Sequence, residues 1–317
     1  MSLRNLRFWN CCVLGCPAAA AIDLGLCDRC RQHFCALHLS SPSHGCPGQT
    51  AAQTEELKNL RRMVNDQCLL RRASERYGGL PCALLDWALM GKKYVHLCIQ
   101  FSNGATWLAR ILRYNHTSLS DELSNDAMKA ERATLKWLEN IDVPSPKLHD
   151  YSLRNDRQNN VGVAYMLIDE LPGIPLLHKR PSVEELRRVY DSYAKILSTL
   201  QGFPFHRIGC LSFRQDGDIH VGPIVGDKMY LEMICSGQLF SAYPINAYLV
   251  FNYLKHLAST SRWNALEPIL DDGPFFLNIW MTRGYHILVD ERYNITGIID
   301  WTYARVVPAF EAYGLSL

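Results

Sequence analysis

Two carboxylates near the end of the chain have the residue types and spacing that chemistry at a cleft requires. Residues 287–289 form a short apolar run and residues 295–299 form a second one, with a polar turn at 291–294 between them. Asp290 closes the first predicted strand and Asp300 closes the second. A carboxylate at a strand end beside a cleft is well placed to bind a metal ion or a substrate.

The segment just before these strands offers a contrast. Residues 273–289 contain neither Asp nor Glu. The stretch 278–286 therefore supplies no carboxylate that could accept a proton from a substrate hydroxyl as a general base.

A second set of candidate ligands lies at the N-terminus, where seven of the 12 cysteines fall within residues 11–46 and are mixed with histidines. Three pairs separated by one or two residues can each present two ligands to one ion, and Cys11 or Cys12 with Cys16 supplies a fourth pair. Eight ligands suit two tetrahedral zinc ions. The mixture of Cys and His favours metal binding over disulfides, and so a reducing compartment, the cytoplasm or nucleus. The candidate zinc ligands are Cys11, Cys12, Cys16, Cys27, Cys30, Cys35, His38, His44 and Cys46.

This spacing closely resembles the AN-one-type zinc finger, which has paired cysteines followed by C-x2-C, F-C-x2-H and H-x-C. Residues 34–38 and 44–46 fit the last two patterns without a gap. The resemblance implies a cross-braced finger that displays a surface to a protein partner. One zinc would take Cys11 (or Cys12), Cys16, Cys35 and His38, and the other would take Cys27, Cys30, His44 and Cys46. Cys11 is favoured over Cys12, and free thiols in a disordered tail are the alternative.

The elements after residue 50 must position the remaining candidates. Residues 55–77 have a helical pattern that ends at two glycines, and residues 95–101 alternate as a strand before a turn at 102–104. Residues 107–112 form the returning strand, with Arg110 inside an otherwise apolar run. A buried arginine usually has an anionic partner.

The next predicted element carries Glu131. Residues 121–140 are predicted as a helix with Ser120 as its N-cap, and Glu131 lies in the middle of it. The alternatives are a salt bridge at a strand edge for Arg110 and an exposed helix face for Glu131.

The order of these elements is similar to the small lobe of the aminoglycoside phosphotransferase family, which has a protein-kinase-like fold. Residues 107–111 resemble the W-x-x-R-I stretch of fungal-type members, and residues 131–146 resemble their E-x-x-T-x-x-x-[LV] helix followed by I-x-V-P-x-P. The resemblance covers nearly all of residues 80–317. It implies that Arg110 holds nucleotide phosphates and that Glu131 pairs with it.

The same resemblance assigns the two terminal aspartates. Residues 287–290 and 298–301 match the family's I-L-V-D and I-I-D-W stretches. Asp300 would therefore be a magnesium ligand, with ATP and magnesium as the implied cofactors, and Asp290 would have a structural role.

The family's H-x-D loop is not matched. Without gaps, Ile279 stands at the His position, Met281 at the base position and His286 at the metal-binding Asn position. A thioether cannot accept a proton near neutral pH, and imidazole is a poor ligand for magnesium. Only 16 residues follow Trp301, which implies an incomplete C-terminal lobe.

The expected fold class is α+β: a small cross-braced zinc finger joined to a two-lobed kinase-like domain with an incomplete C-terminal lobe. The expected boundaries are 1–50 for the finger, 51–79 for a linker and helix, 80–168 for the N-terminal lobe and 169–317 for the partial C-terminal lobe. A net charge of +2 with interspersed signs, and no long apolar run, give no sign of a nucleic acid or membrane partner.

The expected function is a zinc-binding protein whose kinase-like domain is a catalytically impaired pseudokinase or binding module. The alternative is an active ATP-dependent kinase that transfers the γ-phosphate to a small-molecule hydroxyl. A further alternative is that compensating frameshifts or a wrong splice site altered residues 278–286 and the early end.

Overall fold

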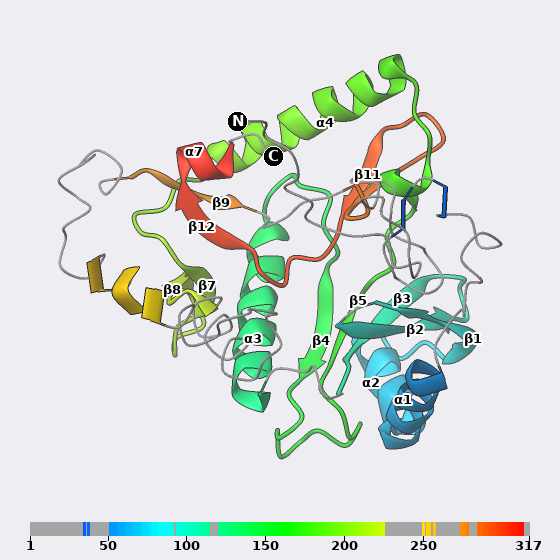
Figure 1. Ribbon diagram of the computed structural model, residues 1–317. Helices are drawn as coiled ribbons and strands as arrows, with labels where there is room; N and C mark the ends of the chain where they lie inside the picture. The colour runs from blue at the N-terminus through cyan, green and yellow to red at the C-terminus, as the bar shows by residue number, and fades with distance from the viewer. Residues whose placement is uncertain are drawn as a thin grey trace. The chain divides into compact units, whose positions relative to one another are not determined.

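The computed structural model describes residues 34–35, 37–38, 51–91, 93–114, 120–225, 249–250, 252–254, 256–257, 273–278 and 284–313. The chain divides into two compact units, Met1–Met63 and Val64–Leu317. Figure 1 shows the described helices and strands of the chain. Helix α1 (Ala51–Met63) is part of the first unit. Most of the predicted zinc finger lies outside the described residues.

The second unit contains a five-stranded sheet in which every neighbouring pair of strands is antiparallel. The strands are β1 (Cys82–Met90), β2 (Tyr94–Phe101), β3 (Thr106–Leu112), β4 (Leu148–Ser152) and β5 (Tyr165–Asp169), in the order β1-β2-β3-β5-β4. The predicted strands around residues 95–101 and 107–112 are confirmed. Cys98 departs from the alternating pattern because it is fully buried on the side where polar residues were expected.

Helices α2 (Asp66–Arg76) and α3 (Asp121–Leu138) contact opposite faces of this sheet. Arg72 of α2 binds Asp150 of β4 on one face, and Glu131 of α3 binds Arg110 of β3 on the other. Arg110 of β3 lies across from His96 in β2 and Met166 in β5, so these side chains share the face that meets α3. Successive strand residues point to opposite faces, so Tyr165 lies on the face that meets α2. Ser120 caps α3 as predicted, since its hydroxyl accepts a hydrogen bond from the backbone of Leu123 at 3.4 Å.

The single helix predicted for residues 55–77 is wrong at its centre, where the chain breaks into α1 and α2. Asn65 begins α2 because its side chain accepts a hydrogen bond from the backbone N–H of Cys68 at 3.1 Å. Its own N–H donates to the carbonyl of Val161 at 2.9 Å, which fixes the start of α2 against the loop before β5. The predicted end at the glycines is confirmed.

Asp150 of β4 fastens α2 to the sheet. Arg72 donates from Nε and Nη2 to its two carboxylate oxygens at 3.0 and 2.9 Å, and Arg76 donates from Nε at 3.1 Å. The Tyr165 hydroxyl donates to the same carboxylate at 2.7 Å. Asp150 is buried, so these bonds replace the water that the carboxylate loses on folding.

The rest of the second unit is built from short strands beside the long helix α4 (Val183–Gln201). A capping box between Ser182 and Glu185 begins this helix. The described elements are β6 (Ile174–Pro175), η2 (Leu176–His178), β7 (Cys210–Phe213), β8 (Ile219–Gly222), β9 (Phe275–Asn278), β10 (Ile287–Val289), β11 (Ile295–Ile298), β12 (Arg305–Pro308) and α7 (Ala309–Ala312). They form a three-stranded sheet in the order β11-β10-β6 and the pairs β12-β9 and β7-β8. Within the described ranges, no helix combines the length and apolarity needed to cross a bilayer.

The predicted strands that carry the two terminal aspartates are confirmed as β10 and β11, an antiparallel pair. Asp290 holds the turn between them, because its carboxylate accepts hydrogen bonds from the backbones of Arg292 and Asn294, both at 2.8 Å. This is the structural role expected for Asp290. Trp301, 1% exposed, anchors the end of β11 by donating from its indole N–H to the carbonyl of Ile298 at 2.9 Å.

Candidate functional site

Arg110 joins the sheet to the end of β11. Its side chain is buried and forms an ion pair with Glu131 of α3 through Nη1 and Oε1. Its Nη2 donates to Asp300 Oδ1 at 2.9 Å. The predicted pairing of Arg110 with Glu131 is confirmed, and the alternatives of a strand-edge position and an exposed helix face are wrong.

Thr302 completes the network and was not found from the sequence. Its hydroxyl accepts from Arg110 Nη2 at 2.9 Å and lies 3.0 Å from Glu131 Oε2 and 2.8 Å from Asp300 Oδ1. A hydroxyl has one proton, so Thr302 can donate to only one of the two carboxylates at a time. The only signal in the sequence is its position two residues after Asp300.

The two carboxylates have different environments. Glu131 is 1% exposed, whereas the Asp300 side chain is 45% exposed and reaches solvent. Burial raises the pKa of Glu131, and Arg110 offsets part of that rise. Burial also acts to raise the pKa of Asp300, but Arg110, Thr302 and His286 outweigh it and hold that pKa below its usual value. Asp300 therefore stays ionised and can bind a cation, while Glu131 fixes the guanidinium.

The backbone at Asp300 is strained. Its φ angle is +67°, a left-handed conformation that is uncommon for a residue with a side chain. Such a conformation costs on the order of 1–3 kcal/mol and persists where the surrounding structure enforces it. Here it lets the carboxylate face Arg110 while Trp301 enters the core.

His286 is the one described residue of the three loop positions, since Ile279 and Met281 lie outside the described residues. Its Nε2 is 3.6 Å from Asp300 Oδ2. The structure therefore places an imidazole, rather than an amide, beside the candidate metal ligand.

His96 lies directly across the β2–β3 pairing from Arg110. Burial lowers its pKa to about 4, and the nearby guanidinium adds to this effect. The ring is therefore neutral at pH 7, which avoids placing a second positive charge beside Arg110.

Replacing His96 with glutamine should make the stability of the protein less sensitive to acid. The unfolded histidine takes up a proton near pH 6.5, whereas the folded one does so only near pH 4. The unfolded state therefore binds more protons in this window, so stability falls as the pH drops from about 6.5 to 4, by at most roughly 3 kcal/mol for this residue. Urea denaturation at pH 7, 5.5 and 4.5 measures the slope. Equal slopes for the variant and the original protein would contradict this assignment.

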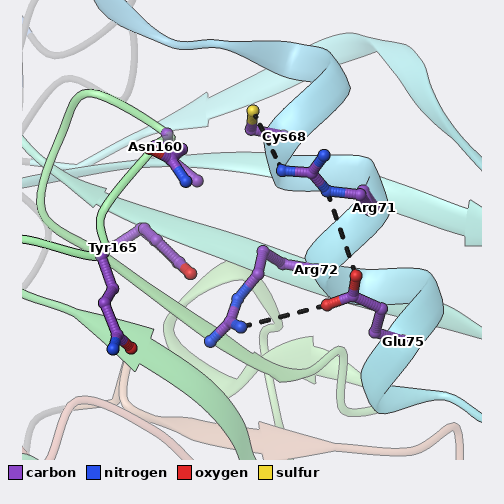
Figure 2. A pocket seen from close by; sticks show the side chains of 8 residues that line it. Cys68, Arg71, Arg72, Glu75, Asn160 and Tyr165 are labelled. Carbon is purple, nitrogen blue, oxygen red and sulfur yellow. Dashed lines mark hydrogen bonds and ion pairs between the residues drawn. The ribbon is translucent and has the colours of Figure 1, made fainter.

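A separate pocket of about 250 Å³ lies beside α2 and does not include Arg110 or Asp300. Arg71, Arg72 and Glu75 line it together on α2 (Figure 2). Its basic groups already face carboxylates. Arg71 Nε lies 4.0 Å from Glu75 Oε1, and Arg72 forms an ion pair with Asp150. An anion would have to compete with these carboxylates, so the pocket is a poor phosphate site.

Two of the predicted zinc ligands are among the described residues. Cys35 Sγ lies 3.4 Å from His38 Nδ1, so the structure brings this pair together. The other candidate ligands, Cys11, Cys12, Cys16, Cys27, Cys30, His44 and Cys46, lie outside the described residues. Among the residues that the structure describes, no cluster of three or more Cys, His, Asp or Glu side chains could hold a metal ion.

Comparison with known families places this geometry in context. Residues 103–219, which include Arg110 and Glu131, match the phosphotransferase enzyme family known as APH. The matched segment covers less than half of the chain. No curated protein matches the chain significantly.

Similar solved structures are remote relatives. A presumed aminoglycoside phosphotransferase of Ralstonia eutropha JMP134 is 12% identical, with a TM-score of 0.47, over 82% of this chain and 68% of that one. A macrolide 2′-phosphotransferase of Brachybacterium faecium is 17% identical, with a TM-score of 0.39, over 76% and 73%. A presumed fructosamine-3-kinase of Thermobifida fusca is 13% identical, with a TM-score of 0.43, over 77% and 75%. These likenesses are too distant to assign a substrate.

Proposed function

We propose that the kinase-like domain binds a nucleoside triphosphate with a divalent cation and has lost most of its capacity for phosphoryl transfer. The observation that supports nucleotide binding most directly is the network at Arg110, which joins a buried glutamate of α3 to an exposed aspartate at the end of β11. The proposed domain has an N-terminal lobe at residues 80–168 and a partial C-terminal lobe at residues 169–317.

The residues present fit both the phosphate groups and the divalent cation of such a ligand. The guanidinium of Arg110 is planar and matches the oxygens of a phosphate, and Glu131 holds it in place. Asp300 supplies an oxygen ligand of the kind that magnesium prefers. A divalent cation bound there would neutralise phosphate charge. The imidazole of His286 beside Asp300 favours manganese over magnesium, because nitrogen ligands suit softer divalent ions.

The loss of transfer rests on the sequence before β10. Residues 273–289 contain no carboxylate, and Met281 stands at the position where the family resemblance implies the base. General base catalysis contributes about 10²–10⁴-fold, so its loss leaves a slow reaction rather than none. The alternative of an active kinase requires another base or transfer by positioning alone.

The proposal is tested by measuring binding and turnover separately. Calorimetric titration with ATP and either magnesium or manganese should show binding, which is tighter with manganese. The release of ADP should then be followed with an aminoglycoside and with a macrolide as acceptor hydroxyls, and we expect no turnover above the rate without acceptor. Robust phosphorylation of either acceptor would replace this proposal with the active-kinase alternative. The absence of any nucleotide binding would reject both.

We also propose that residues 1–50 form a finger with two zinc ions that recognises a protein partner in the cytoplasm or nucleus. The described pair supports this proposal. Zinc–sulfur and zinc–nitrogen bonds of about 2.3 and 2.0–2.1 Å in a tetrahedron place the two ligand atoms about 3.5 Å apart. Cys35 Sγ and His38 Nδ1 are 3.4 Å apart, so this pair fits one ion.

Purified protein should contain about two equivalents of zinc by elemental analysis. Replacing Cys35 with serine should lower the content to about one equivalent, since it removes a thiolate from one ion only. Replacing Cys68 with serine is the matched control, because Cys68 lies in α2 and outside the expected ligand set, and it should leave the zinc content unchanged. A zinc content near zero in protein purified without chelators would reject the finger.

A further inference from the structure

Lys93 lies in the turn between β1 and β2 with a partly buried side chain. Its Nζ donates to the Tyr303 hydroxyl at 2.6 Å. The same ammonium lies 4.6 Å from the centre of the Tyr303 ring and 5.8 Å from that of Tyr94. Among the described residues, no carboxylate lies within ion-pair distance of Lys93. An ammonium has three donors, so a neutral hydroxyl leaves it able to bind an anion.

The position of Lys93 relates it to the Arg110 network. The guanidinium carbon of Arg110 is 3.8 Å from the centre of the Tyr94 ring, so the two cations approach the same aromatic side chain. Tyr303, which holds Lys93, directly follows Thr302 of the network. Arg110 is shared by Glu131 and Asp300, whereas Lys93 has no such neutralisation within the described part of the chain. Within the described residues, Lys93 is therefore a cation near this site with donors left for an incoming anion.

The turn that carries Lys93 is fixed to the sheet. The Gly91 N–H donates to the carbonyl of Tyr94 at 2.8 Å, and the backbone N–H of Arg113 donates to the carbonyl of Lys93 at 2.9 Å. The guanidinium of Arg113 also donates to the carbonyl of Gly91 at 2.6 Å. These bonds hold both sides of the turn at the end of β3, so the lysine is preorganised beside the site.

We propose that Lys93 is a second phosphate-binding cation of this site, held by Tyr303 until the polyphosphate of a nucleoside triphosphate displaces that hydroxyl. The inference rests on the proposed nucleotide binding and adds a residue that the family resemblance did not indicate. Arg110 and Asp300 would contact the phosphates and their cation from the β3 and β11 sides, and Lys93 would contact them from the β1–β2 turn.

The charge state of Lys93 supplies an independent readout. Burial, together with the positive charge of Arg110, lowers the pKa of its ammonium to about 8. The negative charges of Glu131 and Asp300 offset part of this decrease in pKa. A bound phosphate stabilises the charged form and raises this pKa. Nucleotide binding at pH 8.5 should therefore take up protons. The groups that face Lys93 are Tyr94, Tyr303, Arg110, Glu131 and Asp300.

The first experiment compares affinities for ATP with magnesium and for adenosine. Replacing Lys93 with methionine should weaken ATP binding about tenfold or more, because the variant loses a hydrogen bond to the charged phosphates. Adenosine has no phosphates, so its binding should be unchanged. Replacing Lys93 with arginine should preserve most of the ATP affinity. Lys136→Met, which removes a lysine paired with Glu139 on α3, is the matched control and should have no effect.

The second experiment measures proton uptake on ATP binding and keeps a cation at position 93 in both proteins. Calorimetry at pH 8.5 in two buffers with different ionisation enthalpies should show proton uptake for the original protein and none for Lys93→Arg, since arginine stays protonated. ATP affinity unchanged in Lys93→Met, or proton uptake unchanged in Lys93→Arg, would overturn the role of Lys93 while leaving nucleotide binding intact. Absence of ATP binding by the original protein would overturn both proposals.

Discussion

Replacing Arg110 with methionine should lower the free energy of unfolding by about 3–5 kcal/mol, the usual cost of removing one partner of a buried ion pair. Glu131 is 1% exposed and would lose its cation with no water to replace it. Asp300 would lose the same partner at a smaller cost, because its side chain is 45% exposed. Urea denaturation at pH 7 followed by circular dichroism measures the effect.

A second variant separates the lost charge from lost packing. Arg110→Met combined with Glu131→Leu replaces the pair by apolar side chains of similar length, and this exchange is often neutral in buried ion pairs. We expect the double variant to recover most of the stability that the single variant loses. If the double variant loses as much free energy of unfolding as the two single variants lose together, the two charges do not act as a pair in this fold.

Replacing Asp300 with asparagine should weaken the binding of ATP with its divalent cation by roughly one to two orders of magnitude, because the charged oxygen ligand becomes a neutral amide. Any phosphoryl transfer that the protein retains should disappear with it. Binding is measured by calorimetry with magnesium and with manganese, and transfer is measured by ADP release. Unchanged affinity with both metals would refute the assignment of Asp300 as the cation ligand.

The same substitution at Asp290 is the matched control. Asp290 closes the neighbouring strand, but its carboxylate accepts hydrogen bonds from the turn at 292–294 rather than from Arg110. Asp290→Asn should leave nucleotide affinity unchanged and lower stability modestly. A loss of affinity equal to that of Asp300→Asn would show that the effect comes from a disturbed strand pair and not from a lost ligand.

The pairing of Arg110 with Glu131 was implied by the resemblance to aminoglycoside phosphotransferases and not by the residues alone. A charged residue within a predicted buried strand indicates an opposite charge nearby, but it does not say which carboxylate supplies that charge. The strands that end at Asp290 and Asp300 could also be predicted from the sequence, because two apolar runs of three and five residues are joined there by a polar turn.

Thr302 and Lys93 could not be predicted in the same way. A threonine after a strand and a lysine in a turn are ordinary surface residues in any sequence. Their roles arise only when β2, β3 and the end of β11 come together, a contact between residues about 200 positions apart. The break between α1 and α2 was missed for a related reason, since Asn65 caps a helix whose start is fixed by Val161 in a distant loop.

The bonds at Asp150 define where the second compact unit can be separated from the residues before it. A cut after Met63 keeps Arg72 and Arg76 with the carboxylate that they neutralise. A cut at residue 79, where the sequence alone suggested the lobe to begin, removes both arginines. It would leave the buried Asp150 carboxylate with the Tyr165 hydroxyl as its remaining partner in the described network. Helix α2 is therefore best treated as the first element of the second compact unit in any expression of that unit alone.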